Sequence, residues 1–149
     1  MELEFKRNKR ITLIQVHGPT LGSEEGIVEK FYEDLQKTLT EAENIKHNEI
    51  IMGDFNSQIG EGQKGEEKII GPYCYRKRNK NGESLIDFCV ENNMKITNTW
   101  FKKKHNRRWT WISPNLKTKN QIDYFITNQK YKNIKHCGVE RTFKCETDH

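Results

Sequence analysis

The sequence lacks the features that define several large protein classes. Its four cysteines, Cys74, Cys89, Cys137 and Cys145, form no C-x-x-C pair, which argues against the common zinc motifs and a disulfide framework. No stretch approaches the roughly 18 apolar residues of a membrane span, and the N-terminus lacks the apolar region of a signal peptide. We therefore expect an intracellular protein that makes no membrane contact.

Hydrophobic residues are also scarce. They make up 33% of the 149 residues while 32% are charged, so a single domain with a modest core is expected. Three Trp, five Tyr and seven Phe argue against disorder. The net charge is +5, and residues 6–10, 76–80 and 102–108 hold half of the 26 Lys and Arg residues. Such clusters are typical of a polyanion-binding face or of solvated loops.

The spacing of apolar residues predicts strands and helices that alternate at first, with strands dominating later. Such an order indicates one α/β or α+β layered domain over residues 1–149. Strands are expected over 11–16, 49–52, 95–98, 108–112, 121–127 and near 138–143, helices over 24–43 and 84–93, a long loop over 57–82 and a turn over 114–120.

Two polar residues follow the strand expected over 49–52. Asp54 and Asn56 are two positions apart, so in extended chain their side chains point to the same side. Gly53 lets the backbone bend or approach a ligand closely. The alternative is an Asx-turn, because Asp and Asn often bond their own backbone.

A further carboxylate, Asp123, lies between Ile122 and Tyr124 in an otherwise apolar strand. Carboxylates are rarely buried unless paired, although a strand position that faces solvent explains Asp123 equally well. Asp148 and His149 close the sequence. An Asp123–His149 pair would fix the histidine tautomer and favour its charged form, which suits a phosphate oxygen.

Together these side chains are the parts of a site for phosphodiester hydrolysis. Hard carboxylate oxygens suit Mg²⁺ or Mn²⁺ rather than a metal that prefers thiolates. A carboxylate base, an amide that orients water and an imidazolium supply the remaining chemistry. The candidate set is Asp54, Asn56, Asp123, Asp148 and His149.

Several stretches resemble, in order, the motifs of the endonuclease/exonuclease/phosphatase superfamily. They are IQVHGPT, IIMGDFNSQIG, TWISPNLKTKNQIDYFI and the terminal TDH. The likeness is greatest to the apurinic/apyrimidinic-type endonuclease of non-LTR retrotransposons. NGESLIDFCVENNMKITNTWF resembles the RTE or BovB branch and the related craniofacial-development-protein-2-like sequences of host genomes.

The resemblance implies part of a four-layer α/β/β/α sandwich of the DNase-I-like type. It also implies in-line attack on a DNA phosphodiester that leaves a nick with a 3′-hydroxyl, in the nucleus if the target is chromosomal. Asp54 would orient or deprotonate water, and Asn56 would position that water and a phosphate oxygen. Asp123 would hold the catalytic His149, and Asp148 would lie at the metal site. No small-molecule cofactor is expected.

The T-W motif of the family falls at Trp109–Trp111. The resemblance implies that Thr110 contacts a backbone phosphate, while Trp109, flanked by Arg107 and Arg108, could stack on a splayed base. Alternatively both Trp side chains belong to the core, and Trp111 is the one expected there.

Three departures from the family pattern bear on activity. His17, a further catalytic candidate, stands where the family usually has a tyrosine that reaches the phosphate; a histidine could still donate a hydrogen bond to it. The asparagine and glutamate strands of the family, including the principal magnesium ligand, would precede residue 1, and a last strand would follow His149. A basic, non-catalytic remnant of such a domain is therefore the alternative function. A phosphatase or phosphodiesterase of the same superfamily agrees less well with the T-W stretch and the basic runs.

Overall fold

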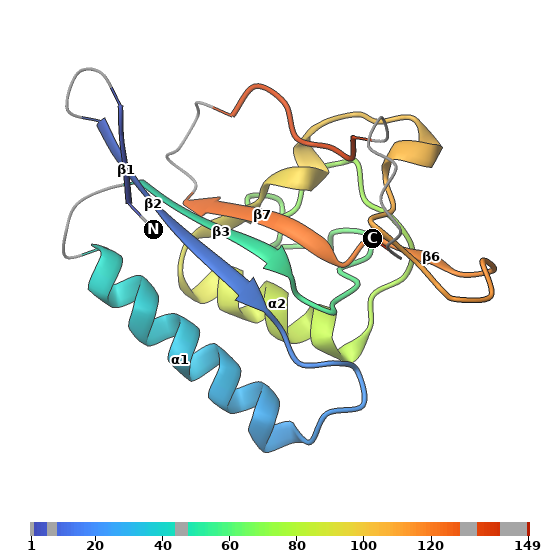
Figure 1. The fold of residues 1–149 in the computed structure, drawn as a ribbon, viewed down its shortest axis with the longest axis horizontal. Coiled ribbons are helices and arrows are strands. Elements are labelled where there is room, and N and C mark those ends of the chain that lie inside the picture. The colour runs from blue at the N-terminus through green and yellow to red at the C-terminus, as the bar shows by residue number, and fades with distance from the viewer. Residues whose placement is uncertain (1, 6–8, 44–47, 129–133, 141–148) are drawn as a thin grey trace.

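The computed structural model describes residues 2–5, 9–43, 48–128, 134–140 and 149. These residues form a mixed α/β structure, as expected from the sequence (Figure 1). The strands are β1 (Glu2–Phe5), β2 (Lys9–His17), β3 (Asn48–Asp54), β4 (Met94–Ile96), β5 (Trp111–Ile112), β6 (Lys119–Asn120) and β7 (Asp123–Asn128); the helices are α1 (Glu25–Glu43) and α2 (Lys80–Glu91), with 3₁₀ turns at Thr97–Trp100 and His105–Arg107.

Five strands form one mixed sheet in the order β1-β2-β3-β7-β4. β2 and β3 are parallel, and α1 provides the crossover that parallel neighbours require. The remaining neighbours are antiparallel, and β5 and β6 form a separate two-stranded ribbon. The four-layer sandwich stays a prediction, because the described residues contain one large sheet and this small ribbon.

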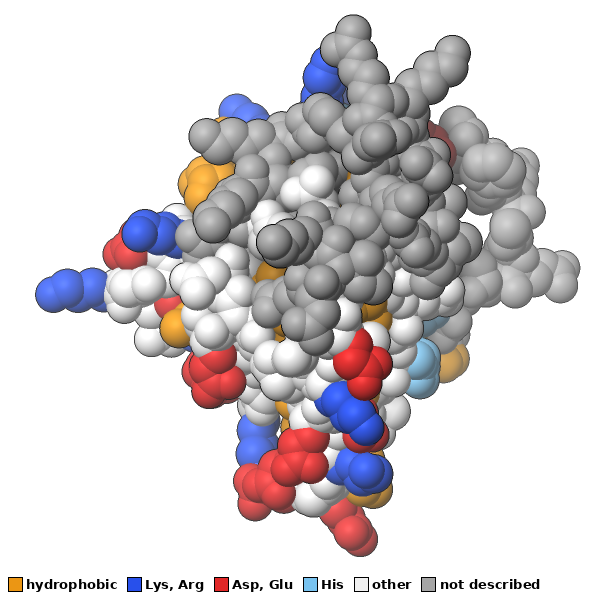
Figure 2. Space-filling model, turned by 90° about the vertical axis from the view of Figure 1, so that its left-hand side faces the viewer, with side chains coloured by type: hydrophobic (Ala, Val, Ile, Leu, Met, Phe, Trp, Pro, Cys, Tyr) orange, Lys and Arg blue, Asp and Glu red, His pale blue; other side chains and the backbone are white. Residues whose placement is uncertain are grey.

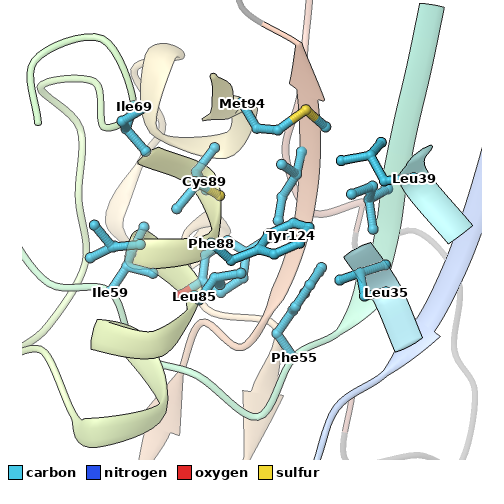
Figure 3. Close-up of a cluster of buried hydrophobic side chains, with 14 of the residues drawn as sticks. Leu35, Leu39, Phe55, Ile59, Ile69, Leu85, Phe88, Cys89, Met94 and Tyr124 are labelled. Atoms are coloured by element: carbon cyan, nitrogen blue, oxygen red, sulfur yellow. The ribbon is translucent and has the colours of Figure 1, made fainter. Parts of the chain in front are cut away.

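The core lies between one face of the sheet and the two helices. Alternation along the strands points Ile14, Ile51 and Ile126 to this face, where all three are buried. Figure 3 shows Tyr124 in the middle of the cluster, surrounded by side chains of α1 and α2. Its buried hydroxyl donates to the carbonyl of Gln121 at 2.7 Å or that of Ser57 at 3.1 Å, so no polar atom is left unsatisfied there.

Both predicted helices are present, but α2 begins earlier than the sequence pattern indicates. Asn79 caps it by accepting a hydrogen bond from the backbone of Gly82 at 2.8 Å, so the helix begins at Lys80 and the loop from residue 57 ends at 79. The apolar pattern alone indicates a start at Ser84, because Gly82 has a low helix propensity. Cys89 is fully buried on this helix, which confirms it as a core residue. Neither helix is long and apolar enough to cross a membrane.

Several strand predictions require correction. The hairpin strand β1 was not expected, because no turn pair such as Asn-Gly marks it. The strand expected over 95–98 ends at Ile96, and the one expected over 108–112 covers only Trp111–Ile112. Residues 119–120, expected in a turn, pair with β5. Of the strand expected near 138–143, residues 138–140 have no regular structure and the rest lies outside the described residues.

The prediction of Trp111 as a core residue is wrong. Trp111 is only partly buried and belongs to the β5–β6 ribbon, not to the central sheet. Within the described residues β5 and β6 form a ribbon of two strands apart from the large sheet, so alternation alone does not place a large side chain in the core.

One residue of the basic run at 76–80, Arg78, is bound within the fold. The guanidinium of Arg78 lies 2.6 Å from Glu66 and 3.1 Å from Glu83 and donates to the carbonyls of Ile59 and Glu61. Only 9% of its side chain is exposed. Arg78 therefore fastens the loop before α2 to the start of that helix and is not available to a polyanion.

Candidate active site

β2 and β3 end, and β7 begins, at the same end of the sheet. Each of these strands contributes one catalytic candidate there. In the register of β2, β3 and β7, His17 is opposite Asp54 and Asp54 is opposite Asp123. Residues opposite one another point to the same face. His17, Asp54 and Asp123 thus stand in a row on the face that the helices do not cover.

His149 completes this row. Its Nδ1 atom lies 3.1 Å from Asp123 Oδ2, and its Nε2 atom lies 3.7 Å from Asp54 Oδ2. The expected carboxylate–imidazole pair is therefore present. The Nδ1 bond fixes the ring so that Nε2 faces Asp54, the more buried of the two carboxylates.

The turn after β3 explains how Asp54 and Asn56 are held. The backbone N–H of Asn56 donates to Asp54 Oδ1 at 2.7 Å, which is the Asx-turn considered as an alternative. The Asn56 amide donates to the carbonyl of Gly18 at 2.9 Å, and Gly18 N donates to the carbonyl of Asp54 at 2.7 Å. The Asx-turn is therefore part of the site, because its hydrogen bonds fix the orientation of the Asp54 and Asn56 side chains.

Gly53 has the backbone freedom that the sequence predicts for it. Its φ is +144°, and a Cβ atom placed there would lie 2.0 Å from the carbonyl oxygen of Val16 on β2. Asn56 adopts a left-handed φ of 48°, which asparagine tolerates better than most residues. Both positions adopt backbone conformations that most side chains disfavour, and together they shape the turn that carries Asp54.

Burial raises the pKa of Asp54, and the nearby Asp123 raises it further, while the Asn56 N–H and the two histidines lower it. Only 14% of the Asp54 side chain is exposed, which agrees with desolvation as the main cause. A carboxylate with a raised pKa is a stronger base than an ordinary aspartate, as the deprotonation of water requires.

The raised pKa implies that Asp54 destabilises the fold when it is ionised. A raised native pKa means that the folded state prefers the protonated form, so stability is lost as the pH rises through that pKa. We expect Asp54→Asn, which has no charge, to increase the free energy of unfolding near neutral pH. The gain should vanish below the ordinary pKa of 3.8, where both proteins are neutral at this position. Urea unfolding at the two pH values tests this, and equal stability near neutrality would contradict it.

Two polar side chains hold the start of β7. Thr110 Oγ1 accepts hydrogen bonds from the backbone N–H groups of Ile122 and Asp123 at 3.1 and 3.2 Å. Asn98 donates to the carbonyl of Asp123 at 3.2 Å and accepts from the N–H of Phe125 at 2.8 Å. Both fix the backbone on which Asp123 stands. The contact of Thr110 with a phosphate stays a prediction.

The basic residues expected near the substrate differ in availability. Arg107 is exposed, whereas Arg108 is partly buried and donates to the carbonyls of Lys103 and Cys74. Trp109 lies under the Lys119 ammonium, 4.8 Å from ring centroid to Nζ. Arg108 therefore supports the loop, and the substrate contacts of Arg107, Arg108 and Trp109 stay predictions.

A metal ion could be held at the same place. One ligand atom from each of Asp54, Asp123 and His149 lies within 4.8 Å of the others. Carboxylate oxygens and an imidazole nitrogen are groups that bind metal ions in proteins, and this arrangement does not select one metal. Asp148, the expected metal ligand, lies outside the described residues.

Several residues that hold the backbone of this site were not predicted from the sequence. Asn98 and Gly18 are two of them, and a Cβ on Gly18 would lie 2.8 Å from the carbonyl oxygen of Phe55. Asn81 is a third, since its buried amide donates to the carbonyls of Pro19 and Asn56. An isolated Asn or Gly gives no periodic signal, although Gly18 next to a proline did indicate a break.

Comparison with known proteins finds relatives that match this chain over part of their own length. No protein-family model matches the chain. Over 140 residues, or 93% of the chain, it is 37% identical to craniofacial development protein 2 of Bos taurus and also to that of Tragulus javanicus. The match covers 23% and 24% of those proteins, so the chain spans about a quarter of the length of these curated relatives. The chain is therefore homologous to a segment of craniofacial development protein 2, a name that states no activity.

Proposed function

We propose that this chain carries the catalytic centre of a Mg²⁺-dependent DNA endonuclease that nicks one strand and leaves a 3′-hydroxyl, as retrotransposons do at their target sites. The observation that carries the proposal is the Asp54–His149–Asp123 row at one edge of the sheet, with distances of 3.7 and 3.1 Å. The order of the motifs, which resembles that of the endonuclease/exonuclease/phosphatase superfamily, supports the same reaction.

Asp54 acts as the base in this proposal. Its Oδ1 atom accepts the N–H of Asn56, which leaves Oδ2 to take a proton from the attacking water. Burial raises the pKa of this carboxyl group and so increases its basicity. One N–H of the Asn56 amide donates to the carbonyl of Gly18. Its other N–H donates to a phosphate oxygen, and its oxygen accepts from the attacking water.

His149 stabilises the charge that develops on the scissile phosphate. The bond from Nδ1 to Asp123 holds the imidazole in one orientation. Nε2–H then donates to a phosphate oxygen. His17 stands beside Asp54 and is exposed, so its ring can donate a second hydrogen bond to the same phosphate.

The ligand set fits a hard divalent cation. The carboxylate of Asp148 is the group proposed to hold it, since Asp54 Oδ2 acts as the base and Asp123 Oδ2 is bonded to His149. Asp148 would share Mg²⁺ or Mn²⁺ with substrate phosphate oxygens and water. When bound, the cation supplies Lewis-acid stabilisation of the phosphoryl oxygens.

DNA is the proposed partner, and the nucleus the proposed location. The chain has a net charge of +5, and the exposed Lys102, Lys104 and Arg107 precede Thr110 on the loop that meets Asp123. A basic loop that leads to the reacting atoms can neutralise the phosphates that flank the scissile bond.

Plasmid nicking tests the proposal. The chain is incubated with supercoiled plasmid and Mg²⁺, beside Asp54→Asn and an Asp34→Asn control on the outer side of α1. We expect nicked circles whose ends are extended by a DNA polymerase. EDTA should stop the reaction, and Asp54→Asn should slow it roughly 10²–10⁴-fold.

Two results would overturn the proposal. Nicking that persists in Asp54→Asn assigns the activity to another site or to a contaminant. Salt-sensitive DNA binding without nicking by the unaltered chain identifies a non-catalytic binding module instead.

A further inference from the structure

A concave surface lies between the two helices, apart from the row of catalytic candidates. It is a groove of about 740 Å³, within the size range of ligand-binding clefts. Residues of α1 and of α2 line it, together with Leu21 and Ser23 from the segment before α1. The floor is apolar: the rings of Tyr32 and Phe88 lie 5.5 Å apart, and Val28 lies beside them.

The rim of the groove is acidic although the chain as a whole is basic. Glu29 and Glu33 of α1 face Asp87 and Glu91 of α2 across the floor. Lys80 on the rim is already bound to Glu25 at 2.9 Å, which leaves Lys37 as the other cation among the lining residues. Figure 2 shows acidic and basic side chains intermixed on the face that it views. The groove is therefore a local concentration of negative charge around an apolar floor.

We propose that this groove is a docking site for an amphipathic helix of a partner protein, with Lys or Arg on both flanks of its apolar face. Apolar side chains at helical spacing fit the Tyr32–Phe88 floor, as in other helix-in-groove complexes. The basic flanks match the carboxylates of both walls, which sets the orientation of the helix and speeds association.

The length of the groove sets the length of this partner helix. The lining residues run from Glu25 to Lys37 on α1 and from Lys80 to Glu91 on α2. At 1.5 Å per residue each wall is about 17 Å long, which corresponds to a helix of about three turns. A segment of about 11–14 residues is therefore sufficient.

A designed peptide tests the docking site without knowledge of the natural partner. The probe is a fluorescein-labelled peptide of about 14 residues, Leu and Lys only, with Leu on one helical face. We expect saturable one-to-one binding by fluorescence anisotropy. A Leu/Glu peptide with the same pattern and a Leu/Lys peptide with scrambled order should not bind. Binding of either control as tight as that of the probe would overturn the proposal, as would no binding of the probe.

Matched variants assign the binding to the groove. Glu29→Lys with Asp87→Lys should weaken binding roughly tenfold, since two attractive rim charges become repulsive. Asp34→Lys with Glu41→Lys changes the charge equally on exposed positions outside the groove and should leave affinity within about twofold. Leu21→Ser, at a position that is 58% exposed, should weaken binding severalfold while the circular dichroism spectrum stays unchanged.

Two further results would contradict the assignment of the groove to a partner helix. Equal affinity of the groove and control variants would place the peptide elsewhere and overturn the proposal. So would a dimer of the unaltered chain, seen by sedimentation velocity, that the groove variant alone converts to monomer. That result would assign the groove to a second copy of the chain.

Discussion

Asp123→Asn is expected to slow plasmid nicking by roughly 10²–10⁴-fold while the protein stays folded. The amide has the size of the carboxylate, and the bonds that hold β7 come from the backbone of Asp123 and not from its side chain. What changes is the partner of His149 Nδ1, at 3.1 Å. An amide can present an N–H to Nδ1 where the carboxylate presents an oxygen, which turns the ring or changes its tautomer.

A double-mutant cycle separates this role from a merely structural one. If Asp123 acts through His149, then Asp123→Asn combined with His149→Ala should be no slower than the slower single variant. Multiplied losses would mean that the two side chains act independently. Asp34→Asn, an exposed helix position, serves as the control for the general effect of removing a charge. Undiminished nicking by Asp123→Asn would contradict the proposed dyad.

Gly53→Ala is expected to destabilise the fold by about 3–5 kcal/mol, because it combines two unfavourable effects. The φ of +144° disfavours any side chain, and the new Cβ would lie 2.0 Å from the carbonyl oxygen of Val16. That oxygen belongs to the neighbouring central strand, so relief requires β2 and β3 to separate where His17 and Asp54 are paired. Unfolding in urea, with its midpoint and slope, measures the loss.

Two other glycines separate these effects. Gly65 has a φ of +99° and no atom within 4 Å of the position that a Cβ would occupy, so Gly65→Ala isolates the conformational cost, about 1–2 kcal/mol. At Gly82 a Cβ would lie 2.0 Å from the carbonyl oxygen of Gln58 without an unusual φ, so Gly82→Ala isolates the clash. We expect Gly53→Ala to cost more than either. A loss no greater than that of Gly65→Ala would mean that the central strands adapt easily.

The parts of the fold that the sequence predicts are those with strong periodic signals. β2, α1, β3 and β7 each combine a run of apolar residues with a clear break, and each lies close to its expected position. Short elements without such a signal were missed or misplaced, namely β1, the β5–β6 ribbon and the first turn of α2. Their formation depends on pairing with distant residues or on a single capping side chain.

The reacting groups of the candidate site could be predicted from the sequence, but the residues that hold their backbone in place could not. Asp54, Asp123 and His149 are the chemically unusual residues of their segments, and the structure brings them together. Asn98 and Thr110 act through backbone atoms of β7, and no pattern in the sequence shows which backbone a polar side chain will meet. Arg78 illustrates the same limit, because a basic run cannot reveal that one member is bound internally.

The order of strands in the sheet has a consequence for synthesis of the chain. β7 follows all other described strands in sequence yet lies between β3 and β4. Until residues 123–128 leave the ribosome, both of those neighbours present open edges that favour association with other chains. The insertion that closes the edges also delivers Asp123 to Asp54. Completion of the sheet and the meeting of these two carboxylates are therefore one event, and a chain interrupted before residue 123 has neither.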